Sequence, residues 1–276
     1  MTYRQLIDRL LGAGIDNASG EARLLVEHFT NQKPDAPLFD PDAPMDDPQG
    51  RLADAVSRRE SREPLQYILG TWYFWRQEYE VSPDCLVPRP DTEILVEQAL
   101  QRLPRGGRFL DLCTGSGCIP ISMLCERTDA TAVAVELSAP TLALARRNAA
   151  RNGVSAERLT LLQGDVLAPD FLSDIGTFDL IVSNPPYIPT RDLTTLPPET
   201  RREPMLALDG GEDGLIFYRR MLQSDYRALC HHGANFLFEI GYDQGDALCA
   251  LASELSLTCR IFQDYGGNDR VAWVTE

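Results

Sequence analysis

The sequence predicts an α/β fold, in which a small helical domain precedes a doubly wound sheet that ends in an antiparallel edge hairpin. Three observations predict it. Residues 1–70 place apolar side chains at helical spacing. From about residue 106, short apolar runs alternate with helical segments, which is the pattern of parallel strands joined by crossover helices. The last two apolar runs are joined by a short glycine-containing turn, which predicts an antiparallel hairpin at one edge.

The chain is expected to contain a helical domain over residues 1–70, a β-hairpin linker over 71–90 and a main domain over 91–276. Leu6, Ile7, Leu10 and Leu11 recur at helical spacing and predict a first helix that ends near Gly12. Further helices are expected near residues 19–30 and 48–61, with a proline-rich turn at 34–48. Nothing in this domain has catalytic spacing. We therefore expect it to pack on or recruit another protein.

The main domain is expected to begin with a helix whose first turn is proline-containing and acidic, as helix N-termini favour. Its expected strands cover residues 108–112, 131–135, 159–162, 180–182, 235–240, 259–262 and 271–274. Its expected helices cover residues 91–102, 118–127, 140–152, 215–230 and 244–255.

Composition excludes several classes of protein. The chain of 276 residues is 43% hydrophobic and can bury a substantial core. It contains no run of about 18 apolar residues, so we expect no membrane span, and its first residues lack the apolar core of a signal peptide. The net charge of −15 argues against affinity that comes from neutralising phosphates along a duplex. We expect a cytoplasmic protein without direct nucleic-acid binding.

The seven cysteines are scattered, with no CxxC pair and no histidine at metal-ligand spacing. An odd, scattered set favours reduced thiols over disulfides or zinc. We therefore expect neither a disulfide nor a metal site.

Four candidate functional features follow expected strands of the main domain. Ligands of such sheets lie beyond the carboxyl ends of the strands, near the point where the strand order reverses. The features are the loop Cys113–Gly117, Glu136, Asp165–Val166 and the turn Asn184–Tyr187. Their positions predict one shared pocket.

The loop and Glu136 point to a nucleoside cofactor. Gly115 and Gly117 allow backbone to approach a ligand at a helix N-terminus, and Glu136 can accept hydrogen bonds from both ribose hydroxyls. A nicotinamide dinucleotide would need a third glycine where this chain has Pro120. Asp111 ahead of the loop suits a nucleoside carrying a charged amino acid, so we expect S-adenosylmethionine.

The turn Asn184-Pro185-Pro186-Tyr187 is the candidate site of chemistry. Its prolines fix the backbone and remove N–H groups. The Asn184 side chain, free carbonyl oxygens and the Tyr187 ring can hold a planar group that carries an NH₂. A plain strand-ending turn would explain the same residues. The three histidines follow no expected strand, so acid–base catalysis by histidine is not expected.

The combined motifs resemble a known family. Asp111–Gly117 is similar to the first motif of class I methyltransferases, and Asn184–Tyr187 to the signature of amino-group N-methyltransferases. The other motifs resemble the bacterial peptide chain release factor N5-glutamine methyltransferases, the HemK or PrmC type; they are Gln66–Gly70, Pro88–Glu93, Glu203-Pro204 and Asp269-Arg270. Cys113 stands where this family commonly has glycine, and Glu136 where it commonly has aspartate.

The resemblance implies a class I methyltransferase fold and transfer of a methyl group from S-adenosylmethionine to the glutamine of the Gly-Gly-Gln motif in class 1 release factors. It implies that residues 113–117 (Cys, Thr, Gly, Ser and Gly) line the methionine part of the cofactor and that Glu136 binds the ribose. Asp165 and Val166 would lie by the adenine, and Asp111 would hold the loop or the cofactor's amino group. Residues 184–187 would bind the substrate glutamine, with Asn184, Pro185 and Tyr187 catalytic, and Asn184 would also contact the cofactor.

Two other methyl acceptors share this local chemistry. Adenine N6-methyltransferases of DNA or RNA use the same four-residue signature on a flipped base, and the net charge of −15 argues against that acceptor. A sister family methylates a ribosomal protein glutamine, and the Pro90–Glu93 motif favours the release-factor branch. A scaffold that binds the cofactor without catalysis is a third alternative.

Overall fold

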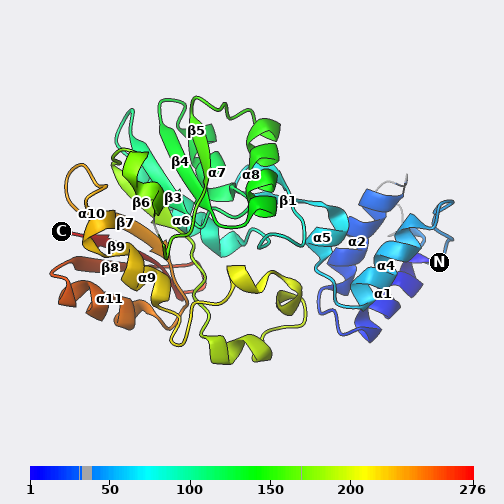
Figure 1. The fold of residues 1–276 in the computed structure, drawn as a ribbon. Coiled ribbons are helices and arrows are strands. Elements are labelled where there is room, and N and C mark those ends of the chain that lie inside the picture. Colours follow the sequence, from blue (N-terminus) through cyan, green and yellow to red (C-terminus); the bar gives the residue numbers. More distant parts are fainter. Residues whose placement is uncertain (31, 33–38, 169) are drawn as a thin grey trace. The chain divides into compact units, whose positions relative to one another are not determined.

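The computed structural model of the chain describes residues 1–30, 32, 39–168 and 170–276 (Figure 1). Part of the expected proline-rich turn, residues 34–38, lies outside the described residues. The chain divides into two compact units. One comprises Met1–Thr71 with Pro197–Arg202, and the other Trp72–Leu196 with Glu203–Glu276. Every helix in the described part of the chain is too short or too polar to cross a bilayer.

The first unit is a helical bundle with one apolar core. Its helices are α1 (Tyr3–Gly12), α2 (Ala18–Phe29), α4 (Arg51–Glu60) and α5 (Leu65–Leu69). The helical periodicity puts Leu6, Leu25 and Val56 in the core, each fully buried. Helix α1 begins with a capping box between Thr2 and Gln5. The short helix α5 was not among the expected elements.

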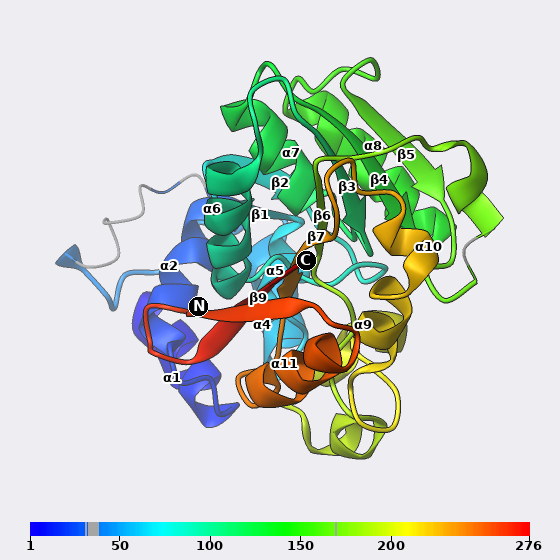
Figure 2. The same ribbon diagram turned by 90° about the vertical axis from the view of Figure 1, so that its left-hand side faces the viewer.

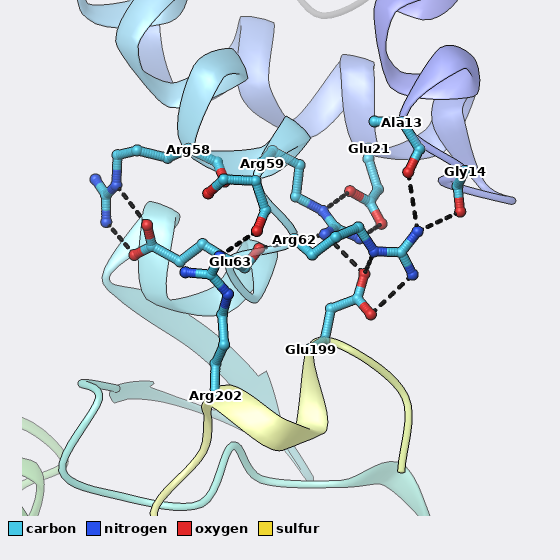
Figure 3. Close-up of polar contacts among 10 residues, drawn as sticks. Ala13, Gly14, Glu21, Arg58, Arg59, Arg62, Glu63, Glu199 and Arg202 are labelled. Carbon is cyan, nitrogen blue, oxygen red and sulfur yellow. Dashed lines mark hydrogen bonds and ion pairs between the residues drawn. The ribbon is translucent and has the colours of Figure 1, made fainter. Parts of the chain in front are cut away.

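A buried arginine connects the segment Pro197–Arg202 to this bundle (Figure 3). The Arg59 side chain is 6% exposed, and its guanidinium lies 2.6 Å from Glu21 and 2.9 Å from Glu199. Arg62 also contacts Glu199, at 2.7 Å, and donates to the Ala13 and Gly14 carbonyls. Residues 197–202 are thus bound to helices from the other end of the sequence.

Replacing Arg59 with methionine is expected to destabilise the helical unit by about 3 kcal/mol, because it leaves the largely buried Glu21 carboxylate without a cation and Glu199 with Arg62 alone. Urea unfolding followed by circular dichroism measures the change. Arg4→Met is the matched control, since Arg4 and Asp42 form an exposed pair, and we expect no detectable change from it. Equal midpoints for Arg59→Met and the unaltered protein would contradict this account.

The second unit contains a sheet with strand order β5-β4-β3-β6-β7-β9-β8. The strands are β3 (Arg108–Leu112), β4 (Thr131–Glu136), β5 (Leu159–Gln163), β6 (Leu180–Ser183), β7 (Asn235–Glu239), β8 (Thr258–Gln263) and β9 (Asp269–Thr275). Strands β3 to β7 are parallel, and the hairpin of β8 and β9 is antiparallel at one edge. The doubly wound sheet with an edge hairpin is confirmed.

Helices cover both faces of this sheet (Figures 1 and 2). They are α6 (Glu93–Arg102), α7 (Cys118–Glu126), α8 (Ala139–Arg151), α9 (Ile216–Met221), α10 (Ser224–Arg227) and α11 (Gly245–Glu254). Alternate residues of each strand face opposite layers. Phe109 and Val182 pack in the core that contains α6 and α7, whereas Leu110 and Ile181 pack with α9 to α11. The expected single helix over 215–230 is wrong, because extended backbone at Gln223 separates α9 from α10.

A two-stranded sheet of β1 (Thr71–Phe74) and β2 (Gln77–Glu80) precedes the main sheet in the chain. It packs on α8 through Asn148, whose side chain accepts from Glu80 N at 2.7 Å and donates to Glu80 O at 3.0 Å. Short 3₁₀ turns occupy several loops: η1 (Pro90–Thr92), η2 (Asp170–Asp174), η3 (Thr190–Thr195), η4 (Thr200–Arg202) and η5 (Met205–Ala207).

The expectation that all cysteines are reduced is wrong, because Cys249 and Cys259 form a disulfide. Cys249 lies on α11 and Cys259 on β8, and the helix packs back on the strand so that the two Cα atoms are 5.1 Å apart. Such a separation permits a disulfide. The cysteines are ten residues apart in sequence, and only the packing of the helix on the strand brings them together.

Candidate active site

A pocket lies at the carboxyl ends of β3, β4, β5 and β6, where the strand order reverses. Among the sequence-predicted residues, those that line it are Cys113, Thr114, Gly115, Ser116, Glu136, Asp165, Val166, Asn184 and Pro186. Four predicted residues are not part of this lining: Asp111, Gly117, Pro185 and Tyr187. The four features chosen from the sequence therefore meet in one place.

The loop Cys113–Gly117 has a backbone that glycine suits. Gly115 and Gly117 have φ values of +57° and +80°, and a Cβ on Gly117 would come within 2.8 Å of Ile121. Cys113 has φ +60°, which explains why a glycine is the usual residue there. The Ser116 carbonyl accepts from the buried Asn148 side chain at 2.9 Å. Asn148 thus connects the loop, α8 and β2, a role that its sequence position did not indicate.

Asp111 is a buried carboxyl group without a hydrogen-bond partner of good geometry among the described residues. Burial raises its pKa to about 8; the nearby Thr114 hydroxyl opposes the rise, and the Glu136 charge adds to it. Such a group favours a bound cation, which would compensate the charge that burial penalises. The amino group and sulfonium of S-adenosylmethionine fit this requirement.

Glu136 ends β4 and is 9% exposed. Its Oε2 accepts from Gly115 N and its Oε1 from Ser138 N, both at 2.9 Å. Burial raises its pKa, and these backbone N–H groups oppose the rise. Each oxygen keeps a second lone pair for a ligand hydroxyl. The carboxylate is therefore oriented before any ligand binds.

The β5 side of the pocket presents Asp165 and Val166. Val166 is 4% exposed, and its carbonyl accepts from the Tyr226 hydroxyl at 2.9 Å. The Asp165 Oδ1 accepts from Leu167 N at 2.8 Å. An apolar side chain next to a carboxylate suits an aromatic base with an exocyclic amino group.

The turn after β6 is packed from both sides. Asn184 Nδ2 donates to Thr92 Oγ1 at 3.2 Å, and the Tyr187 carbonyl accepts from Gln244 Nε2 at 2.9 Å. A Cβ on Gly214 would come within 2.3 Å of the Tyr187 carbonyl oxygen, so only glycine permits this close approach. Burial raises the pKa of Tyr187 well above its usual range. The turn is therefore held rigidly.

Sequence reasoning did not identify Thr92 and Glu239 as neighbours of this turn, nor the partner of Arg89. Arg89 pairs with Glu203, whose side chain is 1% exposed, and Glu203 Oε2 also accepts from Val87 N at 2.9 Å. Both Arg89 and the residue after Glu203, Pro204, line the pocket. Arg89 and Glu203 belong to the motifs Pro88–Glu93 and Glu203-Pro204, which the sequence singled out. No local pattern indicated that these two motifs are in contact.

Comparisons with known proteins agree with this geometry. The family described as PrmC N-terminal domain matches residues 2–70, and that described as Methyltransferase small domain matches residues 90–196. A methyltransferase structure from Pyrococcus furiosus shares the fold, with a TM-score of 0.53 and 19% identity, over 71% of this chain and 87% of that one. The class I methyltransferase fold is confirmed.

Two curated relatives are similar over most of their length. A release factor glutamine methyltransferase of Geobacter sulfurreducens is 46% identical over 218 residues, which cover 78% of this chain and 74% of that protein. A release factor glutamine methyltransferase of Caulobacter vibrioides is 41% identical over 271 residues, which cover 96% and 91%. The chain belongs to the release factor glutamine methyltransferases.

Proposed function

We propose that this protein transfers a methyl group from S-adenosylmethionine to the side-chain amide nitrogen, N5, of the glutamine in the Gly-Gly-Gln motif of class 1 peptide chain release factors. The observation that carries the proposal is the Asn184 amide, held at the pocket wall by Thr92 beside a cofactor pocket. The names of relatives up to 46% identical support the same acceptor.

Different residues around the pocket would bind different parts of the cofactor. When bound, the cofactor supplies an electrophilic methyl group. Residues 113–117 contact its methionine part through backbone, and Asp111 compensates its positive charge. Glu136 binds the ribose hydroxyls, while Asp165 and Val166 bind the adenine. These assignments are supported by the unpartnered Asp111 carboxyl and by the pre-oriented Glu136.

Methyl transfer to the substrate glutamine depends on how the enzyme orients the amide nitrogen. An amide nitrogen is a weak nucleophile because its lone pair is delocalised into the carbonyl. The Asn184 Oδ1 and the Pro185 carbonyl accept the two amide hydrogens of the substrate and favour a pyramidal nitrogen, while Tyr187 supports the turn beside them. The rate enhancement comes from positioning the two reactants and from hydrogen bonds that strengthen in the transition state. The N–CH₃ bond forms as the methyl leaves the sulfonium sulfur, which becomes a neutral thioether. The methylated nitrogen is then cationic and strongly acidic, so it loses a proton to give the product without a dedicated base.

The test is incubation with isotopically labelled cofactor and, separately, a class 1 release factor, ribosomal proteins or DNA. We expect label only on the release factor, at the Gly-Gly-Gln glutamine, located by mass spectrometry. Label on a ribosomal protein glutamine or on adenine would replace the proposal with that alternative. The net charge of −15 supports a protein acceptor, without direct nucleic-acid binding. A substrate that takes part in translation supports a cytoplasmic location.

The helical unit supplies a second docking surface for the release factor in this proposal. Deleting residues 1–70 is therefore expected to lower methylation of intact release factor by at least about tenfold, since docking contacts outside the pocket position the glutamine. Cofactor affinity of the shortened protein, measured by calorimetry, should change little. Unchanged methylation would show that the helical unit is not a docking surface.

A further inference from the structure

The contact that holds Asn184 is compatible with either orientation of its amide. A hydroxyl can accept from the amide NH₂ or donate to the amide oxygen. The structure places Nδ2 toward Thr92 Oγ1 at 3.2 Å. This orientation leaves Oδ1, the atom that the reaction needs as an acceptor, for the substrate. The stable orientation of the Asn184 amide depends on which group accepts the hydrogen bond that the Thr92 hydroxyl donates.

A candidate acceptor for the Thr92 hydroxyl proton is Glu239, whose Oε2 is buried and has no hydrogen-bond partner of good geometry among the described residues. Thr92 is 2% exposed and Glu239 is 1% exposed, at the carboxyl end of β7. The Thr92 hydroxyl stabilises the charged form of Glu239, and the Tyr187 hydroxyl donates to Glu239 Oε1 at 3.5 Å. An ionised carboxylate only accepts. A Thr92 hydroxyl that points to this carboxylate therefore donates to it, and the lone pairs of the Thr92 oxygen remain for Asn184 Nδ2.

Protonation of Glu239 would remove this constraint. A neutral carboxylic acid can donate to Thr92, which would free the threonine to donate to Asn184 Oδ1 and favour the opposite amide orientation. The groups that act on the Glu239 carboxyl are Thr92 and Asp91 from η1, Arg270 from β9 and Tyr187 from the turn after β6. Two more titratable groups face this residue: the Tyr218 hydroxyl from α9 donates to its backbone carbonyl, and the pKa of Cys118 from α7 is raised in part by its charge. Burial outweighs Arg270 and the hydroxyl donors and raises the pKa of Glu239 to about 7.

We propose that Thr92 is a positioning residue that keeps the Asn184 amide oxygen toward the substrate, and that ionised Glu239 orients the Thr92 hydroxyl for this purpose. The inference rests on the proposed function, because it concerns the same amide-to-amide contact. It assigns a role to the threonine of the Pro90–Glu93 motif that cofactor and substrate contacts leave unexplained. It also makes turnover depend on the charge of a residue behind the pocket wall.

The first experiment compares Thr92→Val with Thr92→Ser. Valine keeps the shape of threonine but removes the hydroxyl, so kcat should fall by about 10²-fold, as for loss of one oriented catalytic hydrogen bond. KM for the release factor and cofactor affinity should change less than about threefold, because ground-state contacts persist. Serine restores the hydroxyl and should recover most of kcat. A Thr92→Val enzyme with unaltered kcat would overturn the inference.

The second experiment uses pH and does not depend on the stability of Thr92→Val. With both substrates saturating, kcat of the unaltered enzyme should fall about tenfold per pH unit below an apparent pKa near 7, as Glu239 takes up one proton. Glu239→Gln should have a lower maximum and no transition in this range. A Glu239→Gln profile identical to that of the unaltered enzyme would overturn the inference.

The two hypotheses fail in different ways. An unaltered enzyme that leaves the release factor unlabelled overturns the proposed function itself. An active enzyme whose Thr92→Val and Glu239→Gln variants behave like it overturns only the positioning role. Circular dichroism melting of each variant separates loss of kcat from loss of fold.

Discussion

Alanine at position 184 is expected to lower kcat by at least about 10³-fold, because it removes an acceptor that the proposed transition state needs. Cofactor affinity should remain within about threefold, since the proposed cofactor contacts come mainly from the loop 113–117 and Glu136. Labelled methyl transfer to release factor measures kcat, and calorimetry measures affinity. The combination distinguishes a reaction defect from a binding defect.

A matched control is Asn268→Ala, which removes an exposed asparagine from the turn between β8 and β9. It should retain the kcat of the unaltered enzyme. Turnover of Asn184→Ala comparable to the control would mean that the substrate amide is held by other groups. The Pro185 carbonyl would then be the next candidate acceptor.

Asparagine at position 111 is expected to weaken cofactor binding by about 10²-fold, because a buried carboxylate facing a cation contributes a few kcal/mol that a neutral amide does not. The two side chains have nearly the same shape, so the loop 113–117 should keep its conformation. Isothermal titration calorimetry gives the affinities. Equal affinity for Asp111→Asn and the unaltered protein would show that Asp111 only supports the loop.

The same substitution has an opposite effect on the ligand-free protein. The pKa of Asp111 is raised to about 8 in the fold from an ordinary value of 3.8. The folded state therefore binds one more proton than the unfolded state between these values, and stability falls as pH rises through that range. Asp111→Asn lacks this loss, so its melting temperature should exceed that of the unaltered protein at pH 8 but not at pH 4. Parallel melting curves across this range would contradict the buried, unpaired carboxyl.

Cofactor binding should also release protons near neutral pH. A bound cation favours the ionised form of Asp111, so a group that is mostly protonated at pH 7 loses its proton on binding. Calorimetry in two buffers of different ionisation enthalpy measures this release. It should be smaller in Asp111→Asn, in which position 111 no longer titrates.

Local sequence patterns predicted most of the helices and strands. Strand β6 contains the apolar run Leu180–Val182, because both faces of a central parallel strand are buried. Glycines at 115 and 117 predicted a backbone that few other residues adopt. These signals depend on neighbours within a few residues. The break between α9 and α10 was missed because neither glycine nor proline occurs at residues 222–223.

Contacts between distant residues could not be predicted in the same way. Thr92 and Asn184 are 92 residues apart in sequence, and Arg59 and Glu199 are 140 apart. The disulfide between Cys249 and Cys259 depends on how α11 packs on β8. No local pattern encodes such pairs, because each is decided by which elements become neighbours.

The sequence by itself determined the chemistry of this protein: a loop for a nucleoside cofactor and a proline-rich turn that presents an amide. It did so because turn geometry and functional groups are properties of short segments. Only the tertiary structure decided which end of the Asn184 amide is held, which carboxyl groups are buried, and to which unit residues 197–202 belong. Those outcomes depend on desolvation and on partners that folding brings together.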